Sequence, residues 1–206
     1  MKPLIGLIDY GAGNIFSVEN ALQGLACNVV IATSPEMLKN VDKIILPGVG
    51  AFPDGMNKLN ELGFSSYLRE NIGSGKHILG ICLGMQLLLS IGKEGRETEG
   101  LGFITGSIEK LVSTSNCRVP HVGWNDIYGD ELKSMELFSD IDLGSSFYFV
   151  HSYHAVPSDN LKVLYTNYCD RDIVAAFQKE NLHGVQFHPE KSQKVGIKLL
   201  RNFISL

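Results

Sequence analysis

The chain has 206 residues, of which 44% are hydrophobic, and its 18 basic and 22 acidic residues give a net charge of −4. A chain of this length can bury roughly 70% of its unfolded surface, so we expect one domain spanning residues 1–206. The weak negative charge, without any run of five like charges, argues against nucleic acid and anionic membranes as partners. No apolar stretch reaches the roughly 20 residues that cross a membrane, and the N-terminus lacks a signal-peptide pattern, so we expect a soluble, cytoplasmic protein.

The first half of the chain alternates short apolar runs with amphipathic stretches, which is typical of parallel strands joined by crossover helices. We expect strands at residues 4–8, 29–32, 43–46 and 77–81. We expect helices at residues 14–25, 35–40 and 83–90, with two more helical segments between the third and fourth strands, ending near residue 72.

The second half has shorter apolar runs separated by turn residues, which predict mostly antiparallel strands. These strands are expected at residues 107–112, 122–128, 146–151, 163–168, 173–178 and 183–187, within the same sheet system. A final helix is expected at residues 193–204. The predicted fold class is therefore α/β: a mixed, largely parallel central sheet flanked by helices, with an antiparallel C-terminal part.

Cys82 lies between Gly80 and Gly84, where the strand at residues 77–81 is expected to turn into a helix. Such a turn exposes the residue at the junction, and the glycines allow the strained backbone and the close approach of neighbouring elements. The thiolate is the attacking species and is favoured by the positive end of a helix, so Cys82 is a candidate nucleophile. By itself, the motif fits a small buried core cysteine equally well.

A second motif, Phe-His-Pro-Glu at residues 187–190, leaves the last predicted strand. A nucleophilic cysteine needs a base beside the thiol and a group that fixes the tautomer of that base, and His188 and Glu190 are candidates for these roles. Pro189 favours an extended backbone at His188, which lets side chains two positions apart project to the same side. Alone, this motif fits a surface turn, but together with Cys82 it predicts a catalytic set.

The remaining cysteine, glycine and histidine patterns do not predict a metal or cofactor site. The four cysteines stand far apart without metal-site spacing, and a disulfide framework is not expected in a cytoplasmic chain. Residues 11–16 lack the third glycine of a dinucleotide-binding fingerprint, because position 16 is Phe. Among the histidines, His77 and His183 are expected to be structural, whereas the sequence leaves open whether His121 and His154 line a cleft.

These motifs resemble those of the class I (triad-type) glutamine amidotransferases, and most closely those of the glutaminase subunits of imidazole glycerol phosphate synthase. The resemblance covers nearly the whole chain. It rests on DYGAGN at residues 9–14, LPGVGAF at 46–52, GICLGMQ at 80–86, PHVGWN at 120–125, YFVHSY at 148–153 and GVQFHPEKS at 184–192. It implies a flavodoxin-like fold and hydrolysis of glutamine to glutamate and ammonia.

The resemblance also implies roles for individual residues. Cys82 would attack the side-chain amide carbon of glutamine, His188 would transfer protons, and Glu190 would orient His188. The amides of Leu83, Val49 and Gly50 would form the oxyanion hole. The substrate's amino acid end would be bound by residues on both sides of the nucleophile, namely Gly48, Gln86, His151, Ser152 and Tyr153.

The resemblance implies a partner as well. The family's motifs occupy both ends of the chain, so we expect the ammonia acceptor to bind a separate (β/α)8-barrel cyclase in a heterodimer, which makes imidazole glycerol phosphate and AICAR. Asn14, Trp124 and Lys191 are candidates for contacting it, although Trp124 also fits a core aromatic. Ile15-Phe16 departs from the Leu-Arg of many members close to this surface.

Three alternatives remain open from the sequence. A paralogous glutaminase could feed a different synthase, such as one that amidates sugars of surface polysaccharides. A peptidase or γ-glutamyl hydrolase could use the same cysteine without a partner. A catalytically silent subunit could keep the fold for docking alone.

Overall fold

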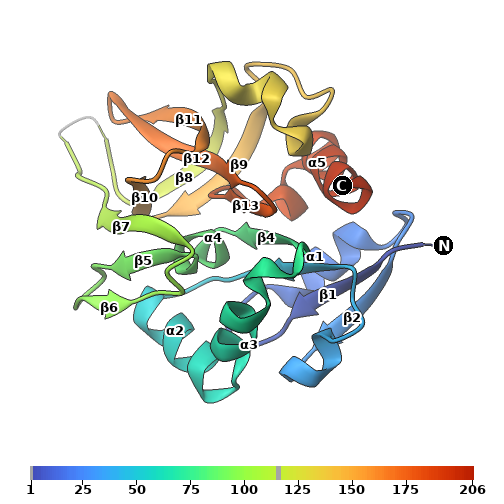
Figure 1. Ribbon diagram of the computed structural model, residues 1–206. Coiled ribbons are helices and arrows are strands. Elements are labelled where there is room, and N and C mark those ends of the chain that lie inside the picture. The colour runs from blue at the N-terminus through green and yellow to red at the C-terminus, as the bar shows by residue number, and fades with distance from the viewer. Residues whose placement is uncertain (1, 115–116) are drawn as a thin grey trace.

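The computed structural model describes residues 2–114 and 117–206, and a seven-stranded sheet forms its centre (Figure 1). The strand order is β11-β12-β13-β4-β3-β1-β2. The five strands from β13 to β2 are parallel, whereas β12 and β11 continue the sheet in antiparallel pairing. These strands are β1 (Leu4–Ile8), β2 (Asn28–Ala32), β3 (Lys43–Leu46), β4 (His77–Ile81), β11 (Lys162–Tyr168), β12 (Arg171–Lys179) and β13 (Leu182–Val185). The predicted α/β class with a largely parallel central sheet is confirmed.

Alternate side chains of the central strands enter two separate apolar clusters, one on each face of the sheet. Leu7 and Ile45 belong to the cluster that contains the apolar side chains of α1 and α5. Ile8 and Ile44 belong to the cluster that contains those of α2, α3 and α4. Burial on both faces explains why these strands are continuous apolar runs. The helices are α1 (Ile15–Leu22), α2 (Phe52–Glu61), α3 (Phe64–Asn71), α4 (Leu83–Leu87) and α5 (Gln193–Ser205), with 3-10 turns η1 (Pro35–Leu38), η2 (Ile72–Ser74), η3 (Asp130–Ser134), η4 (Glu136–Phe138) and η5 (Pro189–Lys191).

The prediction of one sheet system for the second half is wrong. A four-stranded sheet has the order β10-β7-β5-β6, and β8 pairs only with β9 in a two-stranded ribbon. The strands are β5 (Leu89–Gly92), β6 (Thr98–Glu99), β7 (Ile104–Lys110), β8 (His121–Asp126), β9 (Ser146–His151) and β10 (Tyr153–Pro157). Short antiparallel strands carry no signal of which partner they pair with, so the sequence could not divide them among sheets.

The helix predicted at residues 83–90 is also too long. It ends at Leu87, and the chain enters β5 at Leu89. Residues 81–89 are all buried, and a continuous apolar run does not distinguish a buried helix from a buried strand. The helix predicted at residues 14–25 likewise ends early, at Leu22.

A disulfide joins Cys117 and Cys169, which corrects the prediction that the cysteines are unpaired. The two Cα atoms lie 5.4 Å apart, although 52 residues separate them in the sequence. The turn between β11 and β12 brings Cys169 beside the segment that leads into β8, where Tyr168 Oη also donates to Arg118 O at 2.6 Å. Cys27 and Cys82 are free thiols.

Within residues 2–114 and 117–206, no helix is both long and apolar enough to span a membrane.

Candidate active site

The loops that follow β3, β4 and β13 meet at the carboxyl edge of the parallel sheet. They carry Gly48, Cys82 and His188, respectively. In an open α/β sheet this edge is where ligands bind. The three neighbouring strands therefore bring together sequence motifs that are far apart in the chain.

Cys82 occupies a strained turn between β4 and α4. Its backbone has φ 53° and ψ −111°, a conformation that residues with a side chain rarely adopt. A Cβ on Gly84 would overlap the carbonyl oxygen of Leu46, and a Cβ on Gly80 would lie 2.7 Å from the backbone of Met85. The two glycines thus allow α4 to pack directly on the sheet, and Cys82 is held at its edge.

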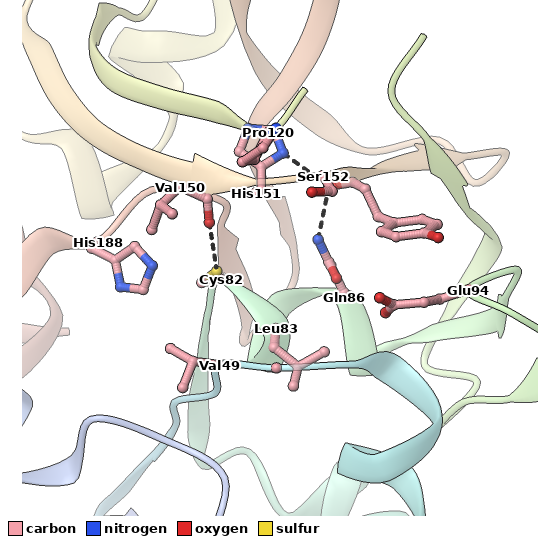
Figure 2. A pocket seen from close by; sticks show the side chains of 12 residues that line it. Val49, Cys82, Leu83, Gln86, Glu94, Pro120, Val150, His151, Ser152 and His188 are labelled. Carbon is pink, nitrogen blue, oxygen red and sulfur yellow. Dashed lines mark hydrogen bonds between the residues drawn. The ribbon is translucent and has the colours of Figure 1, made fainter. Parts of the chain in front are cut away.

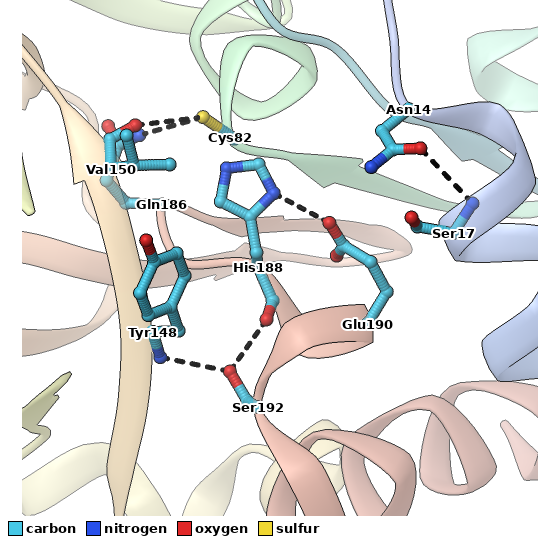
Figure 3. Close-up of polar contacts among 9 residues, drawn as sticks. All are labelled: Asn14, Ser17, Cys82, Tyr148, Val150, Gln186, His188, Glu190 and Ser192. Atoms are coloured by element: carbon cyan, nitrogen blue, oxygen red, sulfur yellow. Dashed lines mark hydrogen bonds and ion pairs between the residues drawn. The ribbon is translucent and has the colours of Figure 1, made fainter. Parts of the chain in front are cut away.

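His188 and Glu190 form a buried pair next to Cys82. His188 Nδ1 lies 2.8 Å from Glu190 Oε1, and their side chains are 3% and 1% exposed. A carboxylate can only accept, so Nδ1 carries a proton, and Nε2 is the nitrogen left to exchange a proton with Cys82. Nε2 has no hydrogen-bond partner within the described part of the chain, and Figure 3 shows the ring between Glu190 and Cys82. Burial alone would lower the pKa of His188, but the neighbouring Cys82 and Glu190 raise it to about 10.

Backbone contacts fix the position of the histidine. His188 N donates to Tyr148 O at 2.9 Å, and its carbonyl accepts from Ser192 Oγ at 2.6 Å. Ser192 Oγ in turn accepts from Tyr148 N at 3.0 Å. His188 has φ −102° and ψ 97°, so the extended backbone predicted from Pro189 is confirmed.

A cavity of about 340 Å³ opens beside Cys82 (Figure 2). Its volume lies in the range of small-molecule sites. Most of the residues predicted to bind substrate or oxyanion line it, together with three that the sequence did not suggest. The lining consists of Val49, Gly50, Cys82, Leu83, Gln86, Glu94, Pro120, Val150, His151, Ser152, Tyr153 and His188.

The predicted oxyanion hole is closed in this structure. Leu83 N–H, which would point at the oxyanion, donates to Gly48 O at 3.3 Å. Gly48 does not line the cavity but is buried, and a Cβ at this residue would come 2.9 Å from Leu83 Cβ. The next two residues of this loop, Val49 and Gly50, are exposed, and the exposed fraction of Val49 is 42%. The backbone of Gly50 has a positive φ of 108°.

The polar groups around the cavity are connected by hydrogen bonds. Gln86 Nε2 donates to Tyr153 O and to Gln186 Oε1, both at 2.9 Å. His151 Nδ1 lies 2.9 Å from Tyr153 O, and its Nε2 lies 3.0 Å from His121 Nδ1. Because a carbonyl only accepts, His151 Nδ1 carries the proton and Nε2 accepts from His121. Burial lowers the pKa of His151 to about 3, so the ring is neutral.

The family of this chain follows from its similarity to known proteins. The model of the family "Glutamine amidotransferase class-I" matches residues 6–206. The chain belongs to this family. It is 46% identical over 204 residues to imidazole glycerol phosphate synthase subunit HisH 1 of Campylobacter jejuni strain RM1221, covering 98% of this chain and 100% of that protein. It is 39% identical to the chloroplastic imidazole glycerol phosphate synthase hisHF of Arabidopsis thaliana, covering 98% of this chain but 34% of that protein.

The amidotransferase fold is also found among solved structures. The structure of PurLQS from Thermotoga maritima superposes with a TM-score of 0.77 at 19% identity, covering 100% of this chain and 99% of that chain. At this identity the likeness concerns the fold alone.

Two polar side chains in or next to this amidotransferase site were missed from the sequence. Glu94 lines the cavity, and its Oε2 accepts from Phe52 N at 2.7 Å, at the start of α2. It lies in a charged stretch without a recognisable pattern, so only the fold reveals it. Gln186 is fully buried beneath the cavity, and its position two residues before His188 was the available signal. Of the histidines left open, His121 is buried behind His151, and neither it nor His154 lines the cavity.

The residues predicted to contact a partner subunit are at the surface of the amidotransferase. Trp124 is 48% exposed rather than part of the core, and it packs edge-on against Tyr148 at 6.0 Å. Lys191 Nζ lies 5.8 Å from the centre of the same tyrosine ring. Asn14 caps α1 by accepting from Ser17 N at 3.3 Å, near Glu190 in Figure 3. Phe16 is 74% exposed.

Proposed function

We propose that this chain is the glutaminase subunit of an imidazole glycerol phosphate synthase, which hydrolyses glutamine to glutamate and ammonia through a cysteine thioester. The observation that carries the proposal is the meeting of Cys82, His188 and Glu190 at one end of a small cavity. The names of the relatives reported above support the choice of synthase.

In this reaction, His188 Nε2 takes the thiol proton and the Cys82 sulfur attacks the side-chain amide carbon of glutamine. The tetrahedral intermediate collapses when the C–N bond breaks and the imidazolium gives its proton to the departing ammonia. Water, activated by the same nitrogen, then attacks the thioester, and glutamate leaves as the thiol is restored. Glu190 accepts from Nδ1–H throughout, so it supports the positive charge on the ring whenever Nε2 is protonated.

We assign Glu94 to the substrate's α-ammonium group. Figure 2 places its carboxylate beyond Gln86, across the cavity from His188. One carboxylate oxygen is held by Phe52 N, which leaves the other free to accept from an ammonium. Gln86 and the backbone at Ser152 and Tyr153 would hold the rest of the amino acid end, while the side-chain amide reaches Cys82.

The oxyanion would bind to Leu83 N–H once the Gly48 carbonyl has moved away. One oxyanion donor contributes about 3 kcal/mol to the transition state. Because Gly48 O occupies this donor, the subunit alone should turn over glutamine slowly. The exposed loop at residues 49–50 is placed to respond to a docked partner.

We further propose that the partner is a (β/α)8-barrel cyclase, which receives the ammonia in the cytoplasm as part of a heterodimer. Asn14, Trp124 and Lys191 would form part of the contact surface. This surface adjoins the catalytic residues, because Lys191 follows Glu190 and Trp124 shares Tyr148 with it. A partner docked on this surface would leave only a short path for ammonia from Cys82.

The proposal is tested by measuring glutamate release in the presence of the cyclase subunit. Cys82→Ala should lower turnover by at least about 10³-fold. Cys27→Ala, the matched control, removes the other free thiol and should leave turnover unchanged. Equal turnover by Cys82→Ala and wild type would refute the proposal. Cleavage of γ-glutamyl peptides without a partner would instead favour a stand-alone hydrolase.

A further inference from the structure

Gln186 is a buried polar residue that the mechanism above does not use. It follows β13 and is 0% exposed, and its backbone N donates to Ala175 O at 2.8 Å. Its side-chain amide lies between two residues of the site. Oε1 accepts from Gln86 Nε2 at 2.9 Å, and Nε2 lies 3.8 Å from Cys82 Sγ.

The orientation of this amide follows from its neighbours. Tyr153 O can only accept, so the nitrogen of Gln86 must face it. The same nitrogen faces Gln186, which must therefore present its oxygen to Gln86 and its nitrogen to the sulfur. A flipped Gln186 would place two NH₂ groups against each other and an oxygen against Cys82. The Tyr153 carbonyl thus sets the direction of the whole chain of hydrogen bonds.

The N–H of Gln186 affects the charge state of Cys82, because the other groups around the sulfur differ in which form of the thiol they can bind. Besides the His188 ring, two groups in the part of the chain that the structure describes lie within hydrogen-bonding distance of Sγ: Gln186 Nε2 and Val150 O at 3.9 Å. The carbonyl can bind only the protonated thiol, whereas the amide N–H binds the thiolate more strongly than the thiol. Figure 3 shows both contacts.

We propose that Gln186 is a positioning residue that donates to the Cys82 sulfur and stabilises its thiolate, with its orientation set by Gln86. The inference rests on the proposed function, since it concerns the nucleophile of that reaction. It also links the substrate-binding side of the cavity to the nucleophile, because Gln86 lines the cavity while Gln186 lies beneath it.

The test is the rate at which iodoacetamide alkylates Cys82 in the full chain, followed from pH 5 to pH 10 by peptide mapping. Gln186→Met keeps the volume and removes the donor. It should slow alkylation at pH 7 about tenfold and move the midpoint of the pH–rate curve upward by about one unit, since a hydrogen bond to a charged group is worth this much. The other titratable groups facing Cys82 are His188 with Glu190 behind it, His151 across the cavity and Tyr10 after β1, and all remain in place.

Gln178→Met is the matched control. This glutamine lies on β12, is partly exposed, and donates to Glu180 O at 3.3 Å, so its loss should leave the alkylation curve unchanged. If Gln186→Met does not fold, the isosteric Gln186→Glu replaces it. Its carboxylate can accept from Gln86 but cannot donate to sulfur, and alkylation should slow at least as much.

A folded Gln186 variant with the wild-type curve would overturn the inference. Alkylation needs neither glutamine nor a partner, so its outcome is separate from that of the proposed function. If the alkylation curve of Gln186→Met is shifted but the wild-type protein releases no glutamate, this inference holds and the proposed glutaminase function is rejected.

Discussion

Glu190 holds the ring of His188 in one orientation and one tautomer, because its carboxylate accepts from Nδ1–H at 2.8 Å. The pair is almost fully buried, so the negative charge acts on the ring with little screening by water. The second oxygen, Oε2, has no hydrogen-bond partner within the described residues. In the proposed mechanism, this one side chain sets the tautomer in which the imidazole exchanges a proton with Cys82.

Glu190→Gln keeps the shape of this side chain and removes its charge. We expect kcat for glutamine hydrolysis to fall by about 10² to 10⁴-fold, because the imidazolium loses its support. Glu190 raises the pKa of His188, so the variant should show a lower pKa for this ring. Steady-state kinetics and an NMR titration of the histidine measure the two effects. Unchanged kcat would show that Glu190 has no part in catalysis.

The junction of β4 and α4 depends on close packing between elements. A Cβ on Gly84 would overlap Leu46 O, so even the smallest side chain must push α4 away from β3. This displacement would also move Cys82, which precedes α4 directly. The glycines of this motif are thus required by packing as well as by backbone conformation.

Gly84→Ala should lower the free energy of unfolding by about 3 kcal/mol, the upper range of overpacked cores. Urea denaturation of the variant measures this change. Gly73→Ala is the control, because a Cβ at Gly73 meets no atom within 4 Å. The packing argument fails if the two variants have the same stability.

Several elements were predictable because their signals are local. The parallel strands are recognisable as short apolar runs, and the two motifs that carry the proposed catalytic residues stand directly after two of them. The end of α4 at Leu87 was not predictable, because residues 81–89 are buried throughout. Glu94 joins the cavity only because β5, in the four-stranded sheet, brings the residues after it to the start of α2. Such contacts depend on topology, which residue patterns do not encode.

At the scale of the whole molecule, His77 and His183 form a second close pair on the neighbouring strands β4 and β13, at the other end of these strands from Cys82 and His188, and His183 is buried while His77 is half-buried. His77 Nδ1 and His183 Nε2 lie 3.0 Å apart at the amino ends of β4 and β13. Burial, with a smaller effect of His77, lowers the pKa of His183 to about 3. The folded protein therefore keeps this ring neutral at a pH where the unfolded chain would protonate it.

Between pH 6.5 and about 3 the unfolded state binds a proton that His183 in the folded state does not, so stability is lost as the pH falls. At pH 5 this amounts to about 2 kcal/mol relative to neutral pH. His183→Gln should remove that part of the pH dependence in urea titrations, while His121 and His151 contribute equally to both proteins. Parallel stability curves for wild type and variant would contradict this assignment.

The disulfide between Cys117 and Cys169 closes a loop of 52 residues that includes β8 and β9. In the chain-entropy model it stabilises the oxidised protein by about 4 kcal/mol. Treatment of the wild type with dithiothreitol and the substitution Cys169→Ser should therefore lower the melting temperature to the same value. Dithiothreitol should not lower the melting temperature of Cys169→Ser any further. A melting temperature that is insensitive to the reductant would mean that the bridge does not stabilise the fold. In a reducing cytoplasm, Cys117 and Cys169 would stay reduced and the bridge would not form.

The central claim is that the Cys82 sulfur becomes bonded to the carbonyl carbon of the substrate. The most direct measurement is acid quenching of the protein during turnover of glutamine with the proposed cyclase partner, followed by peptide mapping by mass spectrometry. We predict a glutamyl thioester on the peptide that contains Cys82, and none in Cys82→Ala. Glutamate release without any adduct on Cys82, or with the adduct on Cys27, would contradict the account.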